Sequence, residues 1–110
     1  MRENPPDSQL TVEWVTADII RHYFNTGQYY EKAKSVSLIS YLKRNSHPDQ
    51  PPPGEPVCTH SQIVYYYSQE NSLVAVVHQY YRPDGTVGGS GLPDPKRLVL
   101  EGRILAVRAK

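Results

Sequence analysis

The chain has 110 residues, a formal net charge of +1 and one cysteine, Cys58. This length suits one domain, and a single cysteine excludes an intrachain disulfide, which is typical of a reducing compartment. No apolar run marks a secretory signal in the first residues, and none reaches the roughly 20 residues of a membrane span. We therefore expect one cytoplasmic domain, residues 1–110, with no membrane partner.

Basic residues gather toward the end of the chain. Residues 82–110 carry six Lys/Arg against three Asp/Glu, whereas residues 1–81 carry six against eight. This excess indicates an anionic ligand, with a solvated basic tail as the alternative. The nine tyrosines suit either a small core with a wet rim or a binding surface.

The first 44 residues predict a short arm and two helices. Residues 1–9 are polar and are expected to form a flexible arm. From residue 11 apolar side chains recur at three- and four-residue steps, which predicts a helix over 11–25 that Gly27 ends. Residues 28–44 also carry a helical stripe and predict a second helix. Within them, "SVSLISY" alternates as a strand would, so helix and strand both remain open there.

The rest of the chain predicts a linker and a sheet. Residues 45–56 contain five prolines, which favours an extended, exposed linker that spaces the helices from the sheet, or a proline-rich ligand segment. Residues 61–68 and 72–81 predict a hairpin, and residues 96–108 predict two more short strands. The expected fold is α+β, with two N-terminal helices packed on a C-terminal antiparallel sheet of about four strands.

Residues 78–97, "HQYYRPDGTVGGSGLPDPKR", hold four of the seven glycines and three of the ten prolines. "RPDG" is typical of a type I turn, and the glycine spacing does not match a P-loop or a dinucleotide-binding motif. Successive N–H groups in such a loop can form an anion-binding nest. The loop residues expected to bind a ligand are Gly88, Gly89, Ser90 and Gly91. Prolines after them stiffen the return of the chain and bring Lys96 and Arg97 back toward the strand.

His78 is the candidate acid/base because of its place in the strand over 72–81. Strand alternation puts His78, Tyr80 and Arg82 on one face at steps of about 7 Å. A histidine, a hydroxyl and a fixed cation form a set that can bind or cleave a phosphodiester. The alternative is that His78 is a half-buried strand residue with a satisfied ring. Asp94 is expected to orient Arg82 or Arg97 through a bidentate pair.

N-terminal helices followed by an antiparallel sheet that carries these cations resemble the small metal-independent RNases and RNase toxins, the group of barnase and the RelE-type toxins. The resemblance implies that His78 is the acid/base and that Arg82, Lys96 and Arg97 stabilise the charged phosphorane. It also implies that Tyr80 orients the phosphate or stacks on a base. This chain departs from that group because no strand glutamate accompanies His78 as a partner base.

Metal chemistry has little support in the sequence. Cys58 and His60 are two residues apart, and no C-x-x-C or H-x-x-x-H pair accompanies them. We expect no cofactor and no metal. The leading hypothesis is an RNA-binding, RNA-cleaving domain. The alternative is a non-catalytic module that binds a protein or an anionic ligand through the tyrosine-rich sheet and the glycine loop.

Overall fold

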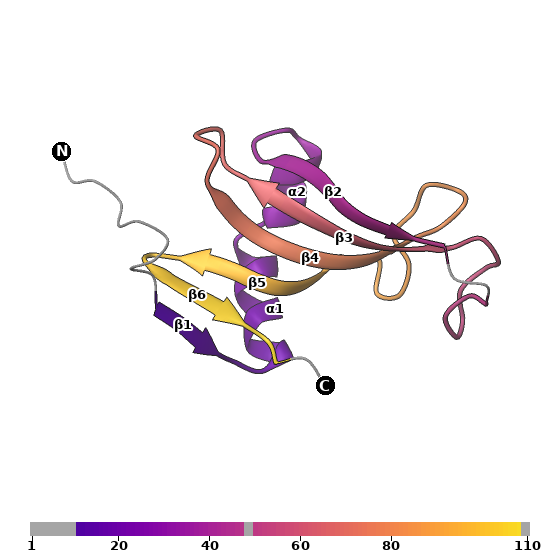
Figure 1. The fold of residues 1–110 in the computed structure, drawn as a ribbon, viewed down its shortest axis with the longest axis horizontal. Coiled ribbons are helices and arrows are strands. Elements are labelled where there is room, and N and C mark those ends of the chain that lie inside the picture. Colours follow the sequence, from indigo (N-terminus) through magenta and orange to yellow (C-terminus); the bar gives the residue numbers. More distant parts are fainter. Residues whose placement is uncertain (1–10, 48–49, 109–110) are drawn as a thin grey trace.

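A twisted sheet forms one layer of the fold and two helices form the other (Figure 1). The computed structural model describes residues 11–47 and 50–108, so the arm expected at residues 1–9 lies outside the described residues. The strands are β1 Thr11–Trp14, β2 Ile39–Ser46, β3 His60–Tyr67, β4 Leu73–Tyr81, β5 Asp94–Leu100 and β6 Arg103–Ala106. They lie in the order β1-β6-β5-β4-β3-β2. Neighbours are antiparallel except β1 and β6, which are parallel, so the sheet is mixed.

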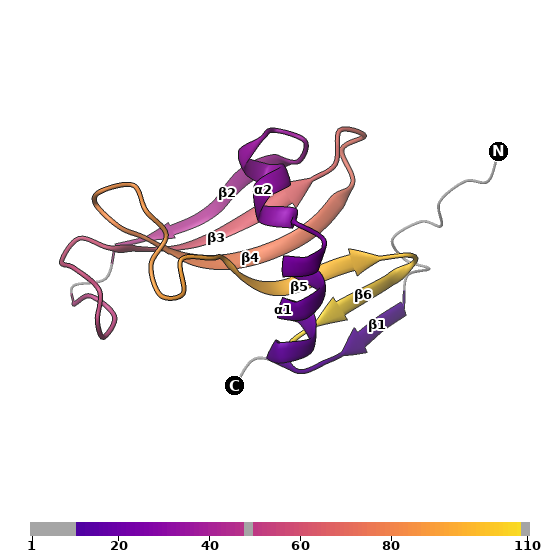
Figure 2. The ribbon, with the colours of Figure 1, turned by 180° about the vertical axis from the view of Figure 1, so that it is seen from behind.

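Both helices cover the same face of the sheet. Figure 2 shows α1 (Ala17–Thr26) and α2 (Tyr29–Lys34) in front of the strands, on the side hidden in Figure 1. We call the opposite, uncovered side the open face. The hydroxyl of Thr16 caps α1 by accepting a hydrogen bond from the Ile19 N–H at 3.3 Å. Gly27 follows the last helical residue, as predicted.

The core lies between α1 and the central strands. Ile20 and Phe24, one helical turn apart, are fully buried, and Val77 and Leu98 meet them from β4 and β5. The Phe24 ring stacks on the ring of Tyr66, with centroids 6.1 Å apart. Aromatic and aliphatic side chains on one stripe of a helix are expected to bury against a sheet in this way.

Strand alternation, which the sequence predicted for residues 72–81, is confirmed. Ala75 and Val77 of β4 are buried beneath the helices. Their neighbours at even positions, including His78 and Tyr80, therefore point to the open face.

The helix predicted over 11–25 is wrong at its start. Thr11–Trp14 form β1, which pairs with β6 through contacts such as Thr11 with Arg103. The Val15 N–H also donates to the Ala106 carbonyl at 2.9 Å. A strand partner from the far end of the chain supplies these hydrogen bonds, so tertiary pairing overrides the helical spacing of the apolar residues.

The second helix, predicted over 28–44, is also only partly right. α2 ends at Lys34, and Val36 adopts a positive φ of 65° that a helix does not continue through. From Ile39 to Ser46 the chain is β2, paired antiparallel to β3 with a bulge between Leu42 and Arg44. The alternative prediction of a strand in "SVSLISY" was therefore correct for the second half of that stretch.

The sheet is larger than the four antiparallel strands predicted, because β1 and β2 were read as helix. The hairpins of β3 with β4 and of β5 with β6 are confirmed. The linker over 45–56 is wrong in its role, since it joins the neighbouring strands β2 and β3 rather than helices to sheet. Pro48 and Asp49 lie outside the described residues. No helix within residues 11–47 or 50–108 is long and apolar enough to cross a membrane.

Candidate active site

A cleft of about 810 Å³ opens where β4 extends beyond its neighbour β5. The ladder between these strands stops at the pair His78 and Asp94. The chain then loops out from Arg82 and returns, with a single bridge from Tyr81 to Val87. Seven of the ten residues that the sequence singled out line this cleft: His78, Tyr80, Gly88, Gly89, Ser90, Asp94 and Lys96.

His78 is half-buried on the open face of β4. Its Nε2 lies 2.8 Å from the Ser61 Oγ of β3, and its ring meets the Tyr80 ring edge-on, with centroids 4.8 Å apart. Burial lowers the pKa of His78, and the charge of Lys96 lowers it further, while Asp94 opposes both. His78 is therefore neutral at pH 7, which is the form that accepts a proton.

Asp94 gathers two cations at the wall of the cleft. Arg21 Nε of α1 donates to Asp94 Oδ1 at 2.9 Å, and Lys96 Nζ donates to Asp94 Oδ2 at 2.9 Å. Burial raises the pKa of Asp94, but the hydrogen bonds from Arg21 and Lys96 outweigh it and leave the pKa below its ordinary value. The carboxylate is ionised, and Arg21 also lies 3.7 Å from the exposed Asp18 carboxylate, so the two cations are matched by two acids.

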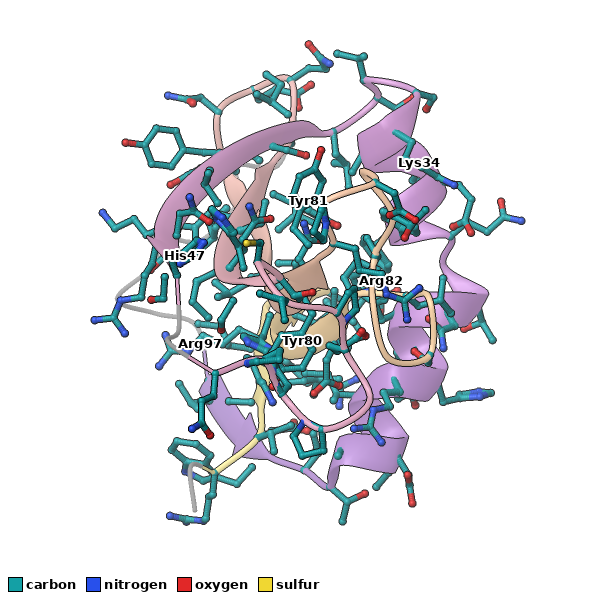
Figure 3. All side chains as sticks on the ribbon, turned by 90° about the vertical axis from the view of Figure 1, so that its right-hand side faces the viewer. Lys34, His47, Tyr80, Tyr81, Arg82 and Arg97 are labelled. Atoms are coloured by element: carbon teal, nitrogen blue, oxygen red, sulfur yellow. The ribbon has the colours of Figure 1, made fainter. Side chains whose placement is uncertain are left out.

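The partners predicted for Asp94 were Arg82 and Arg97, and both assignments are wrong. Arg97 lies on the open face opposite Val76, outside the cleft. Figure 3 shows Arg97 and Arg82 well apart, Arg97 on the side of the sheet away from the helices. At the register shift opposite Val76 and Val77, Lys96 is the extra residue of β5. Lys96 therefore lines the cleft and Arg97 does not, although both line a second hollow on the open face.

Arg82 is held by a carboxylate that the sequence analysis missed. Its Nε and Nη2 each donate to Glu55 at 3.0 Å, and the Gly89 N–H also donates to Glu55 at 3.0 Å. The Glu55 side chain is only 5% exposed. The hydrogen bonds from Arg82, followed by the one from Gly89, lower the pKa of Glu55. Of the glycine N–H groups in the predicted nest, only that of Gly89 therefore meets an anion, and this anion belongs to the chain itself.

The three glycines of the loop differ in what they do. Only Gly89 offers its N–H to an anion. The Gly88 N–H donates to the Tyr80 carbonyl, and a Cβ at Gly88 would meet the Glu55 carboxylate. Gly91 donates to the Gly88 carbonyl and does not line the cleft. Gly88 is thus required for the close approach of Glu55 rather than for ligand binding.

The remaining polar residues shape the turn or lie elsewhere. Asp84 accepts hydrogen bonds from the Thr86 N–H and hydroxyl, as expected for the turn. Cys58 is exposed. Within the described ranges 11–47 and 50–108, no three His, Cys, Asp or Glu side chains gather closely enough to hold a metal ion.

The half-buried ring of His78 should make stability depend on pH. The pKa of His78 in the folded chain lies below its ordinary value of 6.5. Between these two pH values the unfolded chain therefore binds a proton more readily than the folded chain does. Stability should be full above about pH 6.5 and fall as the pH drops through the folded pKa. Because solvent screens the half-exposed ring, we expect the free energy of unfolding to fall by less than about 1 kcal/mol. Urea unfolding at several pH values between 7.5 and 5 measures this loss. His78→Gln should flatten the slope of the free energy of unfolding against pH. His22→Gln, which replaces an exposed histidine of α1, should leave that slope unchanged.

Comparison with known proteins gives no relative for this cleft: no protein-family model, no curated protein and no solved structure matches the chain.

Proposed function

We propose that the chain binds RNA in the cleft at the end of β4 and cleaves it without a metal ion. His78 is the acid/base, and Lys96 and Arg21 contact the phosphate. The observation that carries the proposal is that a neutral histidine, a lysine and an arginine line one cleft. Arg82 and Arg97 have no part in it, since neither lines that cleft.

The histidine is arranged to act as a base. When Nε2–H donates to Ser61 Oγ, the lone pair is on Nδ1, which makes no hydrogen bond to the described residues. Nδ1 takes the proton of a ribose 2′-OH, and that oxygen attacks the adjacent phosphorus. The bond from phosphorus to the 5′-oxygen breaks, and the proton passes from His78 to that oxygen. The products are a 2′,3′-cyclic phosphate and a free 5′-OH.

The two cations stabilise the charge that develops on phosphorus. Lys96 and Arg21 are both held within hydrogen-bond distance of Asp94, so their positions are fixed before the ligand arrives. Fixed cations in a cleft stabilise a charged transition state without reorganising. Tyr80, edge-on to His78, offers a ring on which a base can stack.

Cleavage of an RNA oligonucleotide in EDTA tests the catalytic role. We expect His78→Ala to slow cleavage by about 10²–10⁴-fold, the usual contribution of a general acid/base. His22→Ala, which removes an exposed histidine of α1, should leave the rate unchanged. Absence of cleavage by the wild-type chain, or cleavage that survives His78→Ala, would contradict the assignment.

A second candidate is the non-catalytic binding module, because Asp94 already pairs with both cations. In addition, no second histidine and no carboxylate of residues 11–47 or 50–108 hydrogen-bonds to the His78 ring. In that case the wild-type chain binds RNA but does not cut it. Lys96→Ala should then reduce the slope of log affinity against log salt by about 1. Lys32→Ala on α2 serves as the control, because it lies outside the cleft.

A further inference from the structure

A further pocket lies beside the cleft, on the face of the sheet that the helices cover. Its volume is about 410 Å³, within the range of pockets that bind small ligands. Its floor is formed by β2, β3 and β4, which run beyond α2 (Figure 2), and its walls by α2 and the loop after Tyr81. We call it the side pocket. Gln79 lines both the side pocket and the cleft, so the two adjoin.

The Tyr66 hydroxyl is an unused hydrogen-bond donor in the side pocket. Tyr66 is 2% exposed, and its hydroxyl makes no hydrogen bond to residues 11–47 or 50–108. No polar side-chain atom sealed from solvent is unpaired among these residues, so the hydroxyl reaches the space of the side pocket. Burial, followed by the nearby Tyr30 and Glu31, raises the pKa of Tyr66 far above its ordinary value. The hydroxyl therefore keeps its proton, and because a buried donor normally has an acceptor, it points to a ligand.

The Gln79 amide is held in one orientation at the edge of the side pocket. Its Nε2 donates to Gln62 Oε1 at 2.9 Å, and Gln62 Nε2 donates to Asn45 Oδ1 at 3.2 Å. Gln79 Oε1, which accepts no hydrogen bond from the described residues, stays free beside the second N–H of the amide. An acceptor next to a donor is the arrangement with which glutamine binds the edge of a nucleobase.

The rings and the charge of the lining suit an uncharged planar group. Tyr30 of α2 and Tyr81 of β4 both line the side pocket, and Figure 3 shows Tyr81 between β2 and the helices. Nucleobases stack on such rings. Lys34 is the one charged residue among the described residues of the lining, and Glu31 of the same helix lies close enough to affect Tyr66. The two charges offset each other, so the side pocket favours a base over a phosphate.

We propose that the side pocket binds a nucleobase of the RNA, next to the phosphate held in the cleft. The base stacks on Tyr81, pairs its edge with the Gln79 amide and accepts the hydrogen bond of the Tyr66 hydroxyl. His78 and Gln79 are consecutive, with Cα atoms about 3.8 Å apart, so the phosphate and the base are within reach of one nucleotide. Tyr80, on the open face, is left for the base on the other side of the phosphate. The inference rests on the RNA binding proposed above and not on cleavage.

Nuclear magnetic resonance of the isotope-labelled full chain tests the site with adenosine, which has a base and no phosphate. We expect adenosine to shift the side-chain amide signals of Gln79 and Gln62, and ribose, the control without a base, to shift neither. Absence of these shifts at millimolar adenosine overturns the proposal, while RNA cleavage that depends on His78 would still support the proposed function. Shifts in a chain that does not cut RNA would support the base site and contradict the cleavage.

Two matched pairs of variants locate the base. Tyr66→Phe removes only the hydroxyl and should weaken adenosine binding by about 2–10-fold, the effect of one hydrogen bond. Tyr29→Phe is its control, because Tyr29 stacks on the same Phe24 ring and lies outside the side pocket. Tyr81→Leu should weaken binding by about 5-fold or more through the loss of stacking. Tyr41→Leu, which replaces an exposed tyrosine on the open face, should leave binding unchanged.

Three results with these variants overturn the proposal. Equal weakening by Tyr81→Leu and Tyr41→Leu would place the base on the open face. Equal effects of Tyr66→Phe and Tyr29→Phe would mean that the Tyr66 hydroxyl does not contact the base. An unchanged dissociation constant in both Tyr66→Phe and Tyr81→Leu would place adenosine in the cleft alone, which leaves the proposed function as it stands.

Discussion

Replacement of Phe24 by alanine should lower the free energy of unfolding by about 3–5 kcal/mol, the usual cost of truncating a buried phenylalanine. Phe24 is 0% exposed, and its ring stacks on Tyr29 and Tyr66 with centroids 5.7 and 6.1 Å away. Its removal leaves a cavity between α1 and the sheet that neither ring can fill without leaving its place. Urea unfolding followed by far-UV circular dichroism measures the loss.

Tyr23 provides the matched control, since it is the preceding residue of the same helix and is 43% exposed. Tyr23→Ala should change stability by less than about 1 kcal/mol, as surface substitutions usually do. Equal losses for Phe24→Ala and Tyr23→Ala would mean that α1 does not bury the face described above.

Replacement of Glu55 by alanine should turn the glycine loop into a site for an external anion. In the wild-type chain Glu55 accepts hydrogen bonds from Arg82 and from the Gly89 N–H. Without Glu55 these donors lose their acceptor, and they are the kind of donors that bind a phosphate or sulfate. Inorganic phosphate should therefore raise the melting temperature of Glu55→Ala far more than that of the wild type. In phosphate-free buffer, exchange of the Gly89 amide should accelerate at least about tenfold, because its acceptor is lost.

Two controls separate this effect from general changes in charge. Glu70→Ala removes a carboxylate from the exposed turn between β3 and β4 and should leave the response to phosphate unchanged. Glu55→Gln keeps the size of the side chain and one acceptor oxygen, so its response should be intermediate. An equal response of wild type and Glu55→Ala would contradict the prediction that Glu55 occupies an anion site in this loop.

Local patterns carried most of the information about β3, β4 and the last hairpin. Alternation in "SLVAVVHQYY" correctly placed His78 and Tyr80 on one face, since the period of a strand is set by its own backbone. "RPDG" and the glycines correctly indicated the loop. Each of these signals arises from residues within a few positions of one another, where backbone preferences decide the structure.

Other parts of the fold and the cleft depend on distant partners, which leave no local pattern. Thr11–Trp14 become a strand because β6 offers them a free edge. Arg21 lines the cleft because α1 packs on β5, and the residues close to it in the sequence give no sign of that contact. Glu55 follows a run of prolines, and nothing in that run indicates that it binds Arg82, 27 positions later. Long-range packing therefore determines which cations line the cleft and which carboxylate of the chain binds Arg82.

The pairing of β1 with β6 has a consequence for synthesis of the chain. About 90 residues separate these strands, so at 5–20 residues per second a ribosome makes β6 roughly 5–18 s after β1. During that interval Val12 and Trp14 have no strand beside them and are available to chaperones. β1 is therefore expected to join the sheet last, and the slowest step of folding should be the capture of a segment that was made first.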